Sequence, residues 1–177
     1  MSYCNALLPH ALIVSGRWAG RNDALEIGLH TLRWLTKVQR SPNGCFRPIG
    51  NKGFYRRGEK PAEFDQQPIE AGTMVSACLA AYRTTDDRFW LDEARLAFDW
   101  FLGRNDVGLL LYDSRTGGCC DGLHEDRVNQ NQGAESTLAW LTALAEMKLL
   151  EGSLAAYDTA VEIDRQPVRL ASSGDVR

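Results

Sequence analysis

The stretch FDQQPIEAGTM, residues 64–74, opens a run of helical periodicity with a Gln three positions ahead of a Glu. A second stretch, NQNQGAESTLA at 129–139, has the same arrangement and also leads into a helical run. The paired residues are Gln67 with Gln132 and Glu70 with Glu135. This repeated helix beginning decides how the rest of the chain is interpreted.

The composition is that of one globular domain. The chain has 177 residues, of which 44% are hydrophobic and 24% charged, which suffices for a single core. A net charge of −3 without a long basic stripe argues against nucleic-acid binding. The longest apolar run, 6–16, contains Pro9 and His10 and is too short to span a bilayer. We therefore expect no nucleic-acid partner and no membrane span.

The reactive side chains indicate neither a metal nor a cofactor. The cysteines number five, include the adjacent pair Cys119 and Cys120, and form no CxxC motif, which argues against a disulfide framework or a zinc site. Three dispersed histidines likewise argue against a metal site. Neither a phosphate-binding Gly-rich loop nor a Gly-x-Ser-x-Gly elbow is present. We expect a cytoplasmic protein without a cofactor.

Helical periodicity dominates the chain and predicts an all-α fold. Helices are expected at 5–16, 22–39, 68–83, 87–103 and 134–150, with a weaker one at 153–163. Gly152 is the expected stop between the last two, and LLLYD at 109–113 is the only candidate strand. Residues 41–67 and 104–133 are then two long loops, expected on one face. The helical domain is expected to cover 1–164, with a disordered tail from Arg165.

The two Gln-x-x-Glu stretches belong to a longer internal repeat. The glutamates are 135 − 70 = 65 positions apart, and the same offset pairs Leu79 with Leu144. Trp34 and Trp100 pair at an offset of 66, ahead of the two loops. The order of helix, long loop and helix therefore occurs twice. The alternative is chance combined with the general preference of Glu for the first turn of a helix.

In the repeat alignment, the segment at 5–16 corresponds to the second helix of each repeat. It would therefore be the end of an earlier copy whose loop lies before Met1. This placement predicts a chain cut from, or descended from, something longer.

Several motifs in this order resemble those of a known superfamily. They are L-x-W-L-x-x-x-Q at 32–39, NGCFRPIGNKGF at 43–54, FDQQPIEA at 64–71, WFLGRND at 100–106, TGGCCDGL at 116–123 and VNQNQGAESTLAWL at 128–141. Over residues 3–150 the chain resembles the six-hairpin glycosidase-like (α/α)-toroid superfamily. More narrowly, it is similar to the helical C-terminal domain of bacterial proteins described as glycosyltransferases or mannosyltransferases.

This resemblance implies a ring of alternating inner and outer helices, with a sugar-binding cleft formed by the loops that enter the inner helices. A full toroid has six hairpins and this chain supplies about three, so we expect about half of an (α/α)6 toroid. The implied partners are an oligosaccharide or glycan, with a glycosyltransferase domain or a second copy of the chain as further alternatives.

Carboxylates at the beginnings of inner helices would face one cleft, as glycoside chemistry requires of an acid and a base or nucleophile. The candidate catalytic residues are Glu70, Asp121 and Glu135. Amide, aromatic and other polar side chains of the loops are suited to sugar hydroxyls and rings. These candidate substrate-binding residues are Asn51, Phe54, Asp65, Gln66, Gln67, His124, Asn131 and Gln132.

Each assignment has a structural alternative. Glu70 and Glu135 could instead cap their helices by satisfying loose amide groups. Trp90 and Trp100 have the spacing of helix packing rather than of sugar stacking. His124 could be solvated rather than a third acid or base.

Three classes of function stay open: a toroid enzyme that processes a glycan, a non-catalytic carbohydrate-binding or scaffolding module that serves a glycosyltransferase, and an inactive half-barrel fragment.

Overall fold

The computed structural model describes residues 1–164, and for 156–164 the course of the helix alone. Its helices are α1 (Leu7–Ala19), α2 (Asn22–Val38), α3 (Pro68–Thr85), α4 (Arg88–Phe101) and α5 (Ala134–Asp164). The strands β1 (Gly122–Leu123) and β2 (Val128–Asn129) pair antiparallel, with Gly122 opposite Asn129 and Leu123 opposite Val128. The all-α class is confirmed. The predicted tail from Arg165 lies outside the described residues.

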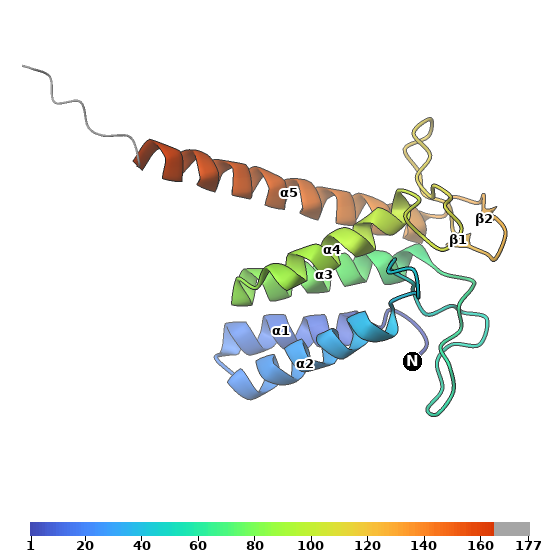
Figure 1. Cartoon of the computed structure of the whole chain (residues 1–177), viewed down its shortest axis with the longest axis horizontal. Coiled ribbons are helices and arrows are strands. Elements are labelled where there is room, and N and C mark those ends of the chain that lie inside the picture. The colour runs from blue at the N-terminus through green and yellow to red at the C-terminus, as the bar shows by residue number, and fades with distance from the viewer. Residues whose placement is uncertain (165–177) are drawn as a thin grey trace, which may run out of the picture. The chain divides into compact units, whose positions relative to one another are not determined.

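Residues 1–146 form one compact unit, and the rest of α5, from Met147 onward, belongs to a second. Within residues 1–146, short and long connections alternate. Short turns join α1 to α2 and α3 to α4, whereas residues 39–67 and 102–133 join α2 to α3 and α4 to α5. Both long loops lie at the same end of this unit, where α1, α3 and α5 begin (Figure 1). The expected placement of the loops is confirmed.

Two glycines allow α1 and α2 to pack closely. A Cβ atom at Gly16 would lie 2.7 Å from the backbone nitrogen of Leu25, and one at Gly28 would lie 2.9 Å from Cγ1 of Ile13. Gly20 ends α1 with a φ of 64°, a left-handed conformation that costs glycine little. The tight turn and the missing side chains together hold the two helices as a hairpin.

Helix α3 is buried along most of its length, as its small side chains predict. Pro68 occupies its first turn and Asp86 ends it in the left-handed region. At Gly72 a Cβ atom would lie 3.0 Å from the carbonyl oxygen of Ala139 in the first turns of α5, so this glycine permits close approach of the two helices. Trp90 and Trp100 of α4 are 1% and 0% exposed, which confirms their packing role.

Two predicted elements are wrong. Gly152 does not end a helix, because α5 continues through it and the segment at 153–163 is not a separate helix. A single glycine costs only about 1 kcal/mol inside a helix, and neither a proline nor a turn motif follows it here. The candidate strand at 109–113 contributes only an isolated bridge between Tyr112 and Cys119.

None of the helices in the described part of the chain combines the length and the apolar character that crossing a membrane requires.

Candidate functional site

The two long loops are bound to each other just before α3 begins. Gln66 and Leu123 form an antiparallel bridge in which each backbone N–H donates to the other residue's carbonyl, at 3.0 and 2.8 Å. Since these residues come from different loops, the bridge fixes the approach of the chain to α3 against β1. A surface built from both loops therefore has a defined geometry.

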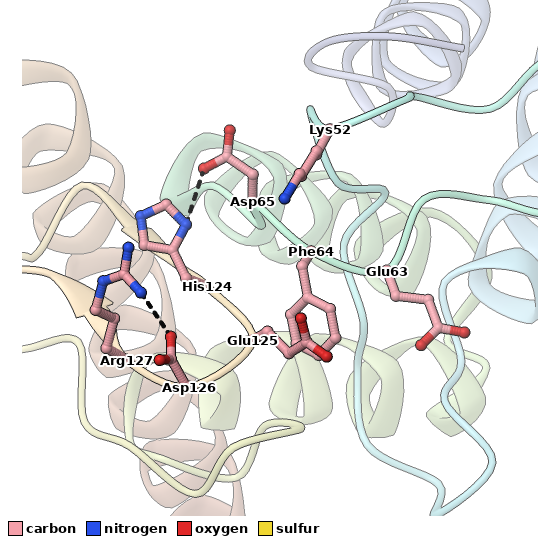
Figure 2. A pocket seen from close by; sticks show the side chains of 8 residues that line it. All are labelled: Lys52, Glu63, Phe64, Asp65, His124, Glu125, Asp126 and Arg127. Carbon is pink, nitrogen blue, oxygen red and sulfur yellow. Dashed lines mark hydrogen bonds and ion pairs between the residues drawn. The ribbon is translucent and has the colours of Figure 1, made fainter.

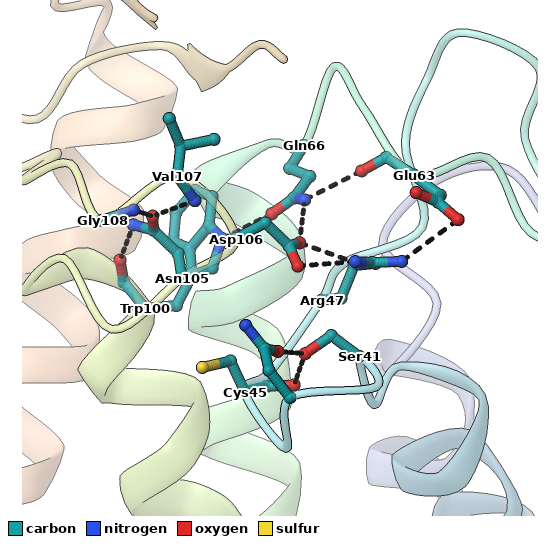
Figure 3. A network of polar contacts seen from close by, with 11 residues as sticks. Ser41, Cys45, Arg47, Glu63, Gln66, Trp100, Asn105, Asp106, Val107 and Gly108 are labelled. Atoms are coloured by element: carbon teal, nitrogen blue, oxygen red, sulfur yellow. Dashed lines mark hydrogen bonds and ion pairs between the residues drawn. The ribbon is translucent and has the colours of Figure 1, made fainter. Parts of the chain in front are cut away.

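A polar network beneath the loops strengthens this link (Figure 3). Gln66 is 0% exposed; its side-chain oxygen accepts a hydrogen bond from Trp100 Nε1 at 2.7 Å, and its Nε2 donates to Asp106 at 2.8 Å. Arg47 binds the same carboxylate through two hydrogen bonds of 2.8 and 2.7 Å. This bidentate pair raises the pKa of Arg47. Gln66 was expected to bind sugar, but its amide group serves this network instead.

The outer surface of the two loops holds a pocket of about 650 Å³ (Figure 2). It is lined by Lys52, Glu63, Phe64, Asp65, His124, Glu125, Asp126 and Arg127. Nδ1 of His124 lies 3.6 Å from Oδ1 of Asp65, an ion pair when the imidazole is protonated. Asp126 and Arg127 form a second pair at 2.7 Å. The pocket thus combines carboxylates, cations and one aromatic ring.

Local backbone geometry places Phe64 and Asp65 at this pocket. A Cβ atom at Gly50 would lie 1.8 Å from the carbonyl oxygen of Phe64, so only glycine lets these segments approach so closely. The backbone nitrogen of Asn51 donates to the carbonyl of Asp65 at 3.0 Å. Asp65 itself has a φ of 60°, in the left-handed region that Asp adopts more readily than most residues.

Two of the predicted site residues, Asp65 and His124, meet in this pocket. The other six lining residues were not predicted as site residues. Five of them lie within three positions of Asp65 or His124 in the sequence, but nothing in the local pattern indicates that the two loops meet. None of Glu70, Asp121 and Glu135 lines this pocket.

Glu70 is buried, at 3% exposure, beneath the segment that precedes α1. Its carboxylate accepts hydrogen bonds from the backbone nitrogen of Asn5 at 3.2 and 3.3 Å and from Asn5 Nδ2 at 3.1 Å. Gln39 Nε2 approaches at 3.5 Å. The partners of this carboxylate therefore come from outside α3, and Gln67 at the N-cap position makes no side-chain cap hydrogen bond. Burial raises the pKa of Glu70, although the contacts from Asn5, Cys4 and Gln39 partly oppose it.

Glu135 is exposed at the corresponding position of α5 and accepts a hydrogen bond from the hydroxyl of Tyr3. This bond, with smaller contributions from burial and from the charge of Glu135, raises the pKa of Tyr3 to about 12. Tyr3 and Asn5 are two residues apart, so one short segment contacts both glutamates of the repeat. Sequence analysis missed this segment, because the contacts join residues 65 and 132 positions apart.

Asp121 holds the beginning of α5. Its Oδ1 accepts from the backbone nitrogen of Gly133 at 2.7 Å, and its Oδ2 accepts from Asn131. Burial alone would raise the pKa of Asp121, but the hydrogen bonds from Ser136, Asn131 and Gly133 together lower it. These hydrogen bonds favour the ionised form of the side chain at the beginning of α5.

The remaining predicted residues have separate surroundings. Gln132 accepts from the hydroxyl of Thr116 at 2.7 Å and donates to Asp113 at 3.3 Å. Asn51 is half-buried and Phe54 is 40% exposed, and neither lines the pocket.

Among the residues that the structure describes, no three His, Cys, Asp or Glu side chains group as a metal site would require. All five cysteines have free thiols. Comparison with protein-family models and with curated proteins gave no match.

Proposed function

We propose that the chain binds an oligosaccharide in the pocket between its two long loops, as part of an (α/α)-toroid domain associated with a glycosyltransferase system. The observation that carries this proposal is the meeting of Asp65 and His124 from different loops in one pocket that also holds an aromatic ring. The resemblance described above supplies the class of ligand.

The helical arrangement supports the toroid part of the proposal. In residues 1–146 the helices α1, α3 and α5 begin at the loop end, and α2 and α4 return the chain through short turns. Alternation of this kind is what inner and outer helices of a toroid require. In a toroid of this kind, the loops entering α3 and α5 would be the sugar-binding loops.

The chemistry of the pocket suits a neutral or weakly charged sugar. Carboxylate oxygens accept hydrogen bonds from hydroxyl groups, and Lys52 and Arg127 donate to hydroxyl oxygens. The half-buried ring of Phe64 offers an apolar face to the C–H groups of a pyranose. Seven of the eight lining residues carry charged or ionisable side chains, so hydrogen bonds would contribute more to sugar binding here than apolar contact.

Calorimetric titration with manno- and gluco-oligosaccharides tests this proposal. We expect binding by the wild type and at least about tenfold weaker binding by Asp65→Asn and His124→Gln, because the first removes a carboxylate acceptor and the second removes the imidazole ring from the pocket. Asp92→Asn is the matched control, because Asp92 is exposed on α4. Equal affinity of Asp65→Asn and the wild type, or binding of neither sugar series, would contradict the proposal.

A second candidate is glycoside processing with Glu70 as the general acid. Burial favours the protonated form of Glu70, and the Oε1 atom of neighbouring Gln39 is buried without a hydrogen-bond partner in the described chain. A protonated Glu70 could donate to that oxygen if the amide were rotated by 180°. This role also requires that residues 3–5 move to admit a substrate. Glu70→Gln would then reduce turnover of an oligosaccharide by about 10²–10⁴. If Glu70 is purely structural, the same substitution leaves any turnover unchanged.

A further inference from the structure

A second pocket lies between α1 and α3, at the opposite end of these helices from the long loops. Its volume is about 550 Å³. Val14 and Ala80 form its apolar part, and Thr84 contributes a hydroxyl group. The charged and aromatic groups come from four further residues, His10, Arg17, Trp18 and Arg83. The proposed oligosaccharide site does not use any of these side chains.

Both arginines present donors at this pocket. Arg17 Nη1 donates to the backbone carbonyl of Arg83 at 3.1 Å, which positions its guanidinium group beside the end of α3. A guanidinium group has five N–H donors, so this one bond leaves others for a ligand. Neither arginine forms an ion pair with a carboxylate among the described residues, and no acidic residue lines the pocket.

The aromatic group of the pocket is unusually accessible. Trp18 is 91% exposed, whereas Trp90, Trp100 and Trp140 are almost fully buried. An indole ring is a large apolar surface that normally packs against other groups, and a face left open beside a pocket can stack against a ring. Helix packing does not account for the exposure of Trp18.

His10 is a half-buried member of the pocket lining. Burial lowers the pKa of His10, the nearby Arg83 lowers it further, and the charge of Glu146 opposes both. Oε2 of Glu146 accepts a hydrogen bond from Ser76 at 2.8 Å. The positive charge of the pocket therefore comes from the two arginines, and a neutral imidazole adds one donor and one acceptor.

We propose that this pocket binds a small organic anion in which a carboxylate is attached to a ring. The two guanidinium groups bind the carboxylate, Trp18 stacks on the ring, and Val14 and Ala80 form the apolar wall. A uronic acid and an aromatic acid share this chemistry. The structural alternative is that Arg17 and Arg83 only neutralise the carbonyl ends of α1 and α3.

Isothermal calorimetry on the whole chain with glucuronate, glucose, benzoate, benzyl alcohol and inorganic phosphate tests the proposal. We expect glucuronate or benzoate to bind at least about tenfold more tightly than its uncharged analogue, because a charge-assisted hydrogen bond supplies the difference. It should also bind more tightly than phosphate, because phosphate has no ring to stack on Trp18. Binding of glucuronate alone identifies an acidic sugar, and binding of benzoate alone identifies an aromatic acid.

Variants locate the site. Arg17→Gln, Arg83→Gln and Trp18→Leu should each weaken binding by about tenfold or more. Arg57→Gln and Trp34→Phe are matched controls on exposed residues elsewhere, and they should bind as the wild type does. Thermal melts monitor folding, although the exposed positions of Arg17, Trp18 and Arg83 make unfolding an unexpected result. The proposal is overturned if neither acid binds up to about 10 mM, if the uncharged analogues bind equally well, or if Arg57→Gln weakens binding as much as Arg17→Gln.

Discussion

Replacing Arg47 by Met should destabilise the chain strongly, because it leaves a buried carboxylate with one partner in place of two. Asp106 has a side chain only 5% exposed and accepts three hydrogen bonds, two from Arg47 and one from Gln66. Arg47→Met removes two of the three while keeping most of the length and apolar surface of the side chain. The carboxylate then has to be hydrated or left with Gln66 as its single partner.

Removing one member of a buried ion pair costs about 3–5 kcal/mol. The side chain of Arg47 is 21% exposed, so water can partly replace it, and we expect a loss of about 2–4 kcal/mol in the free energy of unfolding. For a chain of this length, the melting temperature should fall by roughly 4–16 °C.

Glu63→Gln provides a control on the same arginine. Glu63 pairs with Arg47 at 3.2 Å, but its side chain is 59% exposed, so this pair contributes less than about 1 kcal/mol. Urea denaturation followed by tryptophan fluorescence measures both variants, and the buried Trp100 beside Gln66 reports on the network. A loss below about 0.5 kcal/mol for Arg47→Met, or equal losses for the two variants, would refute the assignment of the stabilisation to the buried carboxylate.

Three further predictions concern the two glutamates and the exposed leucines. Burial raises the pKa of Glu70, so its contribution to stability is largest below the unfolded-state pKa and decreases as pH rises through the folded-state pKa. Glu70→Gln lacks this decrease. Urea titrations from about pH 4 to about pH 8 should therefore show the difference in unfolding free energy between variant and wild type shifting in favour of the variant as pH rises. A constant difference would contradict the burial argument. In an ultraviolet absorbance titration, Glu135→Gln should return the Tyr3 phenol from about 12 toward its ordinary pKa, with Tyr3→Phe identifying the signal, and an unchanged titration would exclude the hydrogen bond. Leu8 and Leu138 are 76% and 62% exposed, so we expect concentration-dependent self-association in sedimentation velocity. Leu8→Gln and Leu138→Gln should reduce this association. A monomer with a high, cooperative melting transition would contradict the expectation.

The helices were predictable because apolar periodicity is a local property of the sequence. Burial of the apolar face then stabilises the helix that the periodicity predicts. The segment at 68–83 has the small side chains of a central helix, and α3 is buried as expected. The end at Gly152 was wrong because a glycine stops a helix only when the following chain favours a turn, and here the helix continues. Local propensity alone does not distinguish a glycine that ends a helix from a glycine inside one.

The candidate site was less predictable because its contacts join distant positions. The repeat matches Glu70 with Glu135, but one carboxylate is buried under Asn5 and the other is exposed beside Tyr3. Likewise Trp100 is buried, whereas its counterpart Trp34 is 42% exposed. Equivalent positions in a repeat share a backbone location, but their neighbours depend on which elements cover each copy.

The bonding of Gln66 also has a thermodynamic consequence for the loops around it. Because the amide group of Gln66 joins Trp100, Asp106 and the carbonyl of Glu63, residues of both loops become ordered when the helical core forms. The chain entropy at these positions is therefore lost when the protein folds and not when a ligand binds. Because these loops are already ordered, binding a ligand costs them little further entropy. They also select ligands by shape, since they do not rearrange to fit other shapes.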